Sequence, residues 1–182
     1  MSGRRCISEI AFATVVLSLI LHCGKPPTFS QQGYFFIGKS DEAMAQRENP
    51  EILRAVEGII TAIVEKKPEA LLTYVHPGEG AIIDAKAFVS YAQVASALHE
   101  PQSQLYRVLW DDKYWKETAP SDNIRSYRKT FLSAGEIRLG LFYYSDSECE
   151  VRLDFKDRPP MGIMANLILR KRNGRWYLMN FF

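Results

Sequence analysis

The spacing of apolar residues along the chain changes once, near Gly135, from a period of about 3.6 residues to a period of 2. Before that point, one long run has apolar positions that would all lie on a single face of a helix. They are Ile52, Leu53, Val56, Ile59, Ile60, Ile63 and Val64. Asn49 is a residue type that caps helices, and Pro50 suits the first helical position. The pattern therefore predicts a helix that begins at Asn49 and ends near Lys67.

Shorter segments between this helix and Gly135 predict further helices and one brief strand. PEALLTYV, which Pro68 opens, predicts a short helix, and HPGEGAIID after it predicts a loop with a brief strand. Apolar residues from about Lys86 to His99 again follow the helical period, and Asp122 is placed to cap a helix over NIRSYRKTFLSAG. QLYRVLWDDKYW fits either a helical turn or a strand.

Segments after Gly135 alternate apolar and polar residues, which is the pattern of strands with one buried face. They are EIRLGLFYYS, CEVRLDFK, GIMANLILRKR and RWYLMNFF. Asn173 and Gly174, between the last two, are a strong signal for a tight hairpin, so we expect an antiparallel meander. Because the helices come first and the strands second, the predicted fold class is α+β, with the N-terminal helices packed on a curved antiparallel sheet.

The N-terminal segment contains an apolar run that is too short to cross a membrane. Arg4 and Arg5 precede IAFATVVLSLIL, a stretch without a charge that is shorter than the roughly 20 residues of a spanning helix. This order is typical of a secretory signal peptide. Pro26 and Pro27 then end any helix, and TFSQQG is typical of a polar tether. GYFFIG, which follows, is expected to dock on the domain as an edge strand, with a segment at the lipid surface as the alternative.

The end of the apolar run, LILHC from Leu19 to Cys23, resembles the lipobox of bacterial lipoproteins. His22 stands where that family usually has Gly, Ala or Ser; spirochaete lipoproteins have looser boxes of this kind. The resemblance implies that the leader is cut before Cys23 and that the Cys23 sulfur carries a lipid, with acyl chains such as palmitate. An uncleaved anchor or a non-lipid export signal are the alternatives. The chain then divides into a signal peptide at 1–22, a lipidated N-terminus and tether at 23–47, and an α+β domain at 48–182.

Composition and charge narrow the class of protein further. A length of 182 residues, 47% of them hydrophobic and 24% charged, is ordinary for one globular domain with its own core. A formal net charge of +2 is too low to indicate a nucleic-acid-binding protein. The basic run from Leu169 to Arg175 is typical of a solvated hairpin tip. Cys6, Cys23 and Cys149 form no metal-binding motif, so neither a metal nor a cofactor is predicted. Without a lipid, Cys23 could pair with Cys149.

The order of elements, helices first and then a long meander ending in GRWYLMNFF, resembles the NTF2-like (cystatin-superfamily) fold over roughly residues 50 to 182. The segment from Tyr74 to Ala92, with its HPGEG turn, is also similar to an element of small exported bacterial proteins. The resemblance implies a long helix lying across a bent sheet and enclosing a pocket. It implies no catalytic residue, because no residue shared by the enzymes of that superfamily is matched here.

His76 is the polar residue with the most chemical potential. It lies in a predicted loop with Glu79 three positions on and Asp84 beyond the brief strand, and a histidine near carboxylates can act as a general base. The alternative interpretation is a turn in which His76 caps a helix end. Asp111 and Asp112 are adjacent, so their side chains point in different directions, and a solvated loop is favoured for them.

Aromatic residues make up 12% of the chain, and the fold decides whether they line a pocket or fill the core. Tyr106, Trp110, Tyr143 and Trp176 are the candidates for a pocket. No phosphate loop, nucleophile elbow or metalloprotease motif is present. The sequence thus predicts a lipid-anchored protein of a bacterial envelope, on the outer or inner membrane and with its domain on the extracytoplasmic side. Its expected role is binding a small ligand or an envelope protein; the alternative is a small-molecule enzyme using His76 with Asp84 or Glu79.

Overall fold

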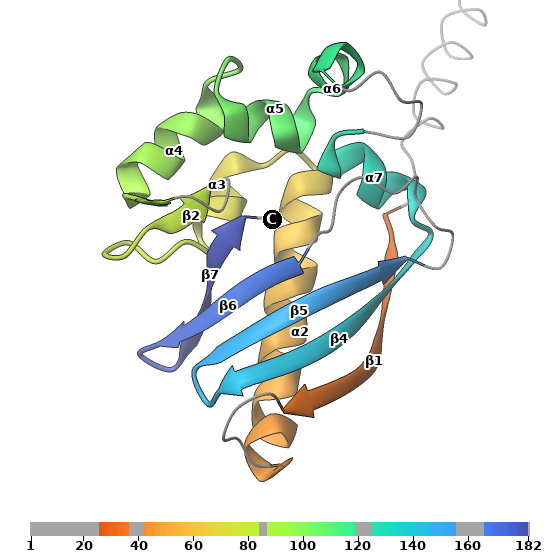
Figure 1. Cartoon of the computed structure of the whole chain (residues 1–182), viewed down its shortest axis with the longest axis vertical. Helices are drawn as coiled ribbons and strands as arrows, with labels where there is room; N and C mark the ends of the chain where they lie inside the picture. The colour runs from red at the N-terminus through yellow and green to blue at the C-terminus, as the bar shows by residue number, and fades with distance from the viewer. Residues whose placement is uncertain (1–25, 37–41, 84–86, 119–124, 156–165, 182) are drawn as a thin grey trace, which may run out of the picture.

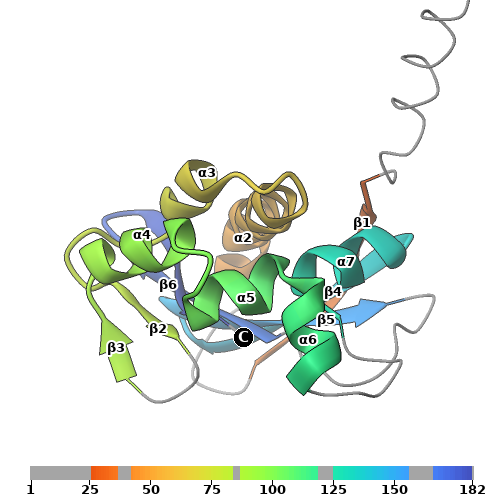
Figure 2. The same ribbon diagram turned by 90° about the horizontal axis from the view of Figure 1, so that it is seen from above.

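The computed structural model describes residues 26–36, 42–83, 87–118, 125–155 and 166–181 (Figure 1). Within these ranges one seven-stranded sheet carries helices on one side, and helix α2 (Glu42–Val64) lies across the strands (Figures 1 and 2). The predicted α+β class, with helices packed on a sheet, is confirmed. In the described part of the chain, no helix combines the length and apolar character needed to cross a membrane.

Helix α2 supplies the centre of the core, but it begins earlier than the sequence predicts. It starts at Glu42 and continues through Pro50, although proline removes one backbone donor from the helix. Asn49 is therefore not a cap. Its side chain is buried, and Oδ1 accepts a hydrogen bond of 2.5 Å from the Tyr143 hydroxyl. The apolar face after it is buried as predicted, including Ile52, Val56, Ile59, Ile60 and Ile63.

The predicted meander is confirmed strand by strand. Its members are β4 (Glu136–Ser145), β5 (Glu148–Phe155), β6 (Asn166–Arg172) and β7 (Arg175–Phe181), each antiparallel to the next. Asn173 and Gly174 join the last two with φ of 51° and 80°. Two successive positive φ values match the right-handed twist of a hairpin, and this is why Asn-Gly is favoured there.

The whole sheet is mixed rather than purely antiparallel, with the order β1-β4-β5-β6-β7-β2-β3. Strand β1 (Thr28–Phe36) runs parallel to β4 at one edge, and β2 (Ala81–Ile83) runs parallel to β7 near the other. Strand β3 (Ala87–Val89) pairs antiparallel with β2. Parallel neighbours need long connections, and the helices between β1 and β4 supply them.

The sequence predicts a tether over residues 23–47, but Thr28–Phe36 within that range form strand β1. TFSQQG and the residues after it pair with β4 from Thr28 opposite Glu136 to Phe36 opposite Tyr143. The docked edge strand expected for GYFFIG is confirmed, and the first residues of α2 also fall inside the predicted tether. The side chains of TFSQQG are mostly polar and do not alternate with apolar ones, so the sequence did not predict a strand there. An edge strand is held by its backbone hydrogen bonds and need not bury alternate side chains.

Short helices cover the rest of that side of the sheet. They are α3 (Pro68–Leu72), α4 (Tyr91–His99), α5 (Gln104–Trp110), α6 (Asp112–Thr118) and α7 (Tyr127–Ser133). The helix predicted from Lys86 is shorter, because β3 occupies its first part and Ser90 forms a capping box with Gln93. Ser126 caps α7, whereas Asp122 lies outside the described residues. QLYRVLWDDKYW is helical in α5 and α6 apart from Asp111, which lies between the two helices.

Candidate functional site

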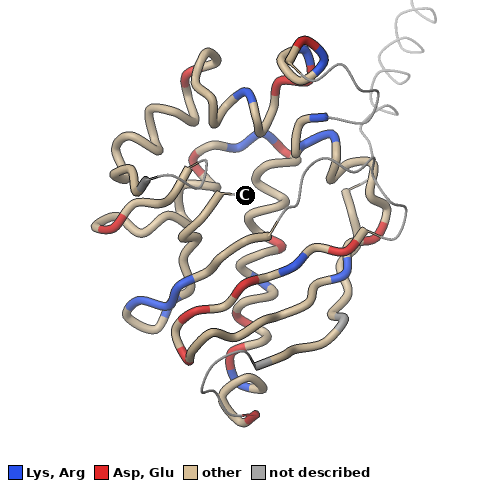
Figure 3. Tube along the Cα trace, in the orientation of Figure 1, with Lys and Arg blue, Asp and Glu red and all other residues tan. Residues whose placement is uncertain are grey.

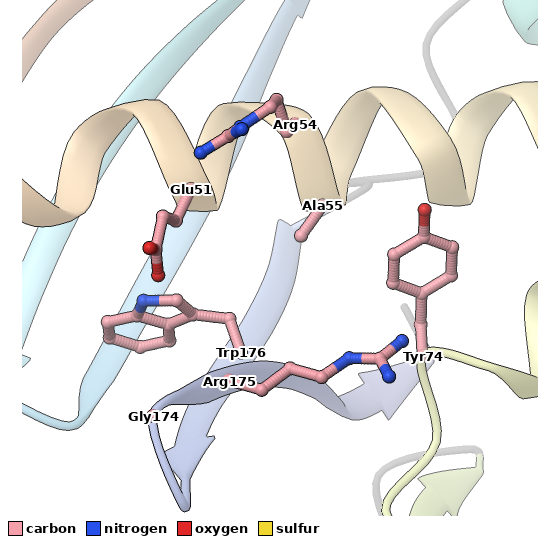
Figure 4. Close-up of a pocket in the computed structure, with 7 residues that line it drawn as sticks. All are labelled: Glu51, Arg54, Ala55, Tyr74, Gly174, Arg175 and Trp176. Carbon is pink, nitrogen blue, oxygen red and sulfur yellow. The ribbon is translucent and has the colours of Figure 1, made fainter.

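A groove of about 330 Å³ lies between the exposed side of α2 and the start of β7. Three segments of the chain line it (Figure 4). Its lining residues are Glu51, Arg54 and Ala55 of α2, Tyr74 of the loop after α3, and Gly174, Arg175 and Trp176 of the β6–β7 hairpin. Its volume is at the small end of the range for ligand sites in proteins.

Two hydrogen bonds fasten the loop after α3 to strand β7 and so close one end of the groove. The backbone N–H of Leu178 donates to the Tyr74 carbonyl at 2.7 Å. Nη2 of Arg175 donates to the Thr73 carbonyl, also at 2.7 Å. The groove is therefore built by tertiary contacts between distant parts of the chain, since Arg175 and Thr73 are 102 positions apart in the sequence.

Tyr74 stands across the groove with its hydroxyl directed at α2 (Figure 4). The helix accepts it at Gly58, where an added Cβ would overlap the Tyr74 hydroxyl oxygen. A glycine in the middle of a helix costs about 1 kcal/mol relative to alanine. Here the missing side chain lets an aromatic ring approach the backbone closely, which explains why the long apolar helix contains a glycine.

The indole of Trp176 forms the apolar floor at the other end of the groove. Trp176 is buried, and its Nε1–H donates to Oε2 of Glu48 at 3.1 Å. The Lys171 ammonium donates to the same oxygen at 2.5 Å, and Nε of Arg47 donates to Oε1 at 3.0 Å. Burial by itself would raise the pKa of the Glu48 carboxyl, but the hydrogen bonds from Lys171, Arg47 and Trp176 outweigh it and lower that pKa. The Trp176 indole is thus held in place by the charged Glu48 carboxylate, which accepts three hydrogen bonds.

Charged side chains of the groove lack ion-pair partners in the described part of the chain. Glu51, Arg54 and Arg175 have no oppositely charged group within 4.0 Å there. Arg54 uses Nε on the Pro50 carbonyl at 3.1 Å, and the Arg175 guanidinium lies 5.3 Å from the centre of the Tyr177 ring. A guanidinium has five N–H donors, so both arginines keep donors that can meet a ligand.

This arrangement suits the binding of an anion with an apolar part. Guanidinium groups recognise carboxylates and phosphates through paired hydrogen bonds, and the half-buried Tyr74 ring offers aromatic surface. The lining residues include no His, Cys, Ser or Thr and only one carboxylate, so the groove holds no nucleophile with an adjacent base. The described ranges also hold no group of three or more His, Cys, Asp or Glu side chains that could bind a metal.

His76, the first catalytic candidate, lies in the turn before β2. Its Nδ1 accepts hydrogen bonds from the backbone N–H groups of Gly78 at 3.2 Å and Glu79 at 3.0 Å, and its ring lies edge-on to Tyr177 at 4.9 Å. Both acceptor bonds of this nitrogen are made to amides of its own turn. The histidine organises the HPGEG turn in this structure.

Glu79, the second candidate, faces arginines of strand β6. Oε1 accepts from Nε of Arg172 at 2.5 Å, and Arg170 lies 4.0 Å from Oε2. The hydrogen bond from Arg172 is the main reason that the pKa of Glu79 is lowered. The space beside His76 and Glu79 is about 10 Å³, no more than one water molecule needs. Asp84, the third candidate, and Cys23 lie outside the described residues.

The aromatic pocket candidates separate into one groove residue and three packing residues. Trp176 lines the groove. Trp110 is buried and donates to the Ile63 carbonyl at 2.9 Å, and Tyr106 packs edge-on against Trp110 at 5.1 Å. Tyr143 is fully buried on Asn49. Cys149 is buried beside Tyr143, and burial raises the pKa of its thiol to about 12, which leaves it unreactive at neutral pH.

Sequence reasoning missed most residues of the groove. Arg175 belonged to the basic hairpin tip, and Glu51 was identified only as a first-turn residue of the predicted helix. Tyr74 was noted only as the first residue of the segment that contains the HPGEG turn. Glu51 and Arg54, three positions apart, place polar side chains on one flank of the apolar helix, and this was the one local hint of a second, solvent-facing surface.

Comparisons with known proteins give structural similarities only. No protein-family model matches the chain, and no curated protein matches it. The chain is similar to the crystal structure of an NTF2-like protein of unknown function from Shewanella oneidensis MR-1, with a TM-score of 0.38, 13% identity, and coverage of 72% of this chain and 94% of that one. It is also similar to a putative scytalone dehydratase from Novosphingobium aromaticivorans DSM 12444, with a TM-score of 0.40, 11% identity, and coverage of 77% and 85%. Similarity at this level carries no argument about what this chain does.

Proposed function

We propose that this chain is a lipid-anchored protein of a bacterial cell envelope whose domain binds a small anionic ligand in the groove between α2 and β7. The observation that carries the ligand-binding part is the pair of guanidinium groups, Arg54 and Arg175, that border an aromatic groove without ion-pair partners in the described residues. Unpaired arginines around a concave apolar surface suit a carboxylate or phosphate attached to a ring or short chain.

The groove supports ligand binding over the two alternatives from the sequence. A protein-interaction module would present a broad exposed surface, whereas Glu51, Arg54 and Arg175 line a hollow of about 330 Å³. The enzyme alternative pairs His76 with Asp84, which lies outside the described residues, or with Glu79, and it would need the histidine and its carboxylate to be available. Instead, His76 Nδ1 holds two backbone amides and the Glu79 carboxylate holds Arg172.

Cellular location is the second part of the proposal. The apolar run before Cys23 has signal-peptide length, and Cys23 occupies the position of a lipid-bearing cysteine. Two or three acyl chains would give lasting attachment, since each buried methylene contributes about 0.8 kcal/mol. The ligand would then be one that reaches the extracytoplasmic side of a bacterial membrane.

Replacing both groove arginines is expected to weaken binding of small anions strongly. The probes are phenyl phosphate and benzoate, and the readout is the NMR signal of the Trp176 indole N–H during titration. For the Arg54→Gln/Arg175→Gln variant we expect the dissociation constant to rise at least tenfold, since each lost charged hydrogen bond is worth about 1.5 to 3 kcal/mol.

Arg138→Gln on β4, outside the groove, is the matched control and should leave the titration unchanged. If neither probe moves the Trp176 signal, or if the double variant binds as well as the wild type, the groove is not an anion site. Loss of binding confined to the groove variant supports the proposal.

A further inference from the structure

The first described residues tie the N-terminus of the domain to one particular end of the fold. The backbone N–H of Thr28 donates to the Gly135 carbonyl at 2.9 Å, and the Thr28 hydroxyl donates to the same oxygen at 3.2 Å. Pro27, one residue earlier, is already buried. Strand β1 therefore begins beside the turn between α7 and β4, at the upper right of Figure 1.

Covalent geometry limits how far this point can lie from Cys23. Thr28 follows Cys23 by five residues, and an extended chain advances at most about 3.6 Å per residue, so their Cα atoms are at most about 18 Å apart. The headgroup layer on each side of a bilayer is itself about 6 Å thick. A lipid on Cys23 therefore keeps the start of β1, beside the α7–β4 turn, within about 18 Å of the lipid interface.

The elements at this end of the fold are α5, α6, α7 and the last turn of α2 (Figures 1 and 2). The Arg128 guanidinium of α7 donates to the Val64 carbonyl of α2 at 2.8 Å, and the Ser126 hydroxyl donates to Asp112 of α6 at 2.8 Å. These bonds hold α2, α6 and α7 together at the end of the fold where β1 begins.

The chemistry of this surface matches that of a membrane interface. Helix α6 has no buried residue and carries Tyr114 and Trp115, which are half-buried, with Trp115 Nε1 donating to the Val108 carbonyl at 3.3 Å. Tyrosine and tryptophan are the residues that favour the headgroup layer. Helix α6 carries both acidic and basic residues (Figure 3). Lys113 pairs with Glu117 at 3.7 Å and Lys129 of α7 with Asp112 at 4.0 Å, so Lys116, which is exposed, is the lysine of α6 without an ion-pair partner in the described residues. A basic group near anionic lipid contributes about 1 kcal/mol of attraction.

We infer that the α5–α6–α7 end of the domain lies on the bilayer surface, with α6 in contact with lipid headgroups; this rests on the proposed lipid at Cys23. The groove then stays open to the aqueous compartment. Arg54 is ten residues before Val64 on α2, which places it about 15 Å along the helix from the membrane-facing end.

Quenching of tryptophan fluorescence by headgroup-labelled lipid tests this orientation. The full-length protein, purified in detergent, is reconstituted into vesicles of phosphatidylethanolamine and phosphatidylglycerol, with or without a lipid that carries a nitroxide on its headgroup. Flotation of the vesicles reports attachment separately. We expect the nitroxide to quench the wild type and the nitroxide-dependent loss of fluorescence to fall at least twofold in Trp115→Phe, because Trp110 and Trp176 are buried in the domain.

A second variant leaves the folded domain untouched and tests the short tether itself. A ten-residue Gly/Ser insertion between Lys25 and Pro26 releases the distance limit, and quenching should fall in zwitterionic vesicles of phosphatidylcholine. Protein that floats with the vesicles without quenching of Trp115 overturns the membrane-facing surface and leaves the lipid anchor standing. Protein that does not float overturns the anchor and this inference together.

Discussion

Glu48→Ala is expected to lower the free energy of unfolding by about 3 kcal/mol, because it removes the acceptor of a buried polar cluster. Glu48 is 2% exposed, and its carboxylate accepts hydrogen bonds from Lys171, Trp176 and Arg47. Without it, the Trp176 N–H and the largely buried Lys171 ammonium lose their partner under α2. Urea denaturation followed by circular dichroism measures the change.

Arg47→Ala is the matched control, because Arg47 is the neighbouring residue and its side chain is 70% exposed. A surface ion pair is worth at most about 1 kcal/mol, so this variant should unfold close to the wild type. Equal losses in the two variants would show that the buried cluster does not stabilise the fold.

The pH dependence of stability follows from the same carboxylate. The pKa of Glu48 is lowered in the folded protein, so its contribution is complete above the unfolded pKa of about 4.3 and is lost as the pH falls through the folded pKa. Stability of Glu48→Gln should therefore fall less steeply than that of the wild type as the pH is lowered below about 5. Part of the slope remains, because Glu79 and Glu150 also have lowered pKa values.

Gly80→Ala is the second change with a large expected effect, a loss of about 3 kcal/mol in the free energy of unfolding. Gly80 has φ of 71°, where a side chain is strained, and an added Cβ would overlap the carbonyl oxygen of Val89. That oxygen belongs to the backbone of β3 and cannot move without separating β2 from β3. The turn that His76 organises closes at this residue, since Gly80 N–H donates to the His76 carbonyl at 2.9 Å.

Gly78→Ala, in the same turn, is the matched control. Its Cβ would lie 3.4 Å from Cε1 of His76 with no positive φ to strain the backbone, so we expect a change below about 1 kcal/mol. Similar thermal unfolding of the two variants would contradict the geometry of the turn.

The parts of the fold that sequence alone predicted are those set by local pattern. Alternation of side chains marks a strand wherever one face is buried, and Asn173-Gly174 supplies the two positive φ values of the hairpin, so the meander was predictable. The start of α2 was not. Asn49 has the chemistry of a cap, but its side chain is recruited by the Tyr143 hydroxyl 94 residues away, and the helix continues through Pro50. Such a contact leaves no trace in nearby sequence.

The groove was not predicted either, because it is formed by residues that are far apart in the sequence. Arg54, Tyr74 and Arg175 come from three segments that meet only because β7 binds the loop after α3 through the Leu178–Tyr74 hydrogen bond. The interpretation of His76 did not depend on distant residues. A histidine followed by Pro-Gly-Glu-Gly can accept the amides of its own turn, and the two hydrogen bonds to its Nδ1 are local.

The measurement that most directly tests whether the domain is held at a membrane through Cys23 is the intact mass of the detergent-extracted protein from a diderm bacterium, with Cys23→Ala beside it. The account predicts a chain that begins at Cys23 and carries the mass of a diacylglyceryl group and acyl chains, all of which the variant lacks. A mass without any lipid, unchanged by the substitution apart from the side chain itself, would contradict it.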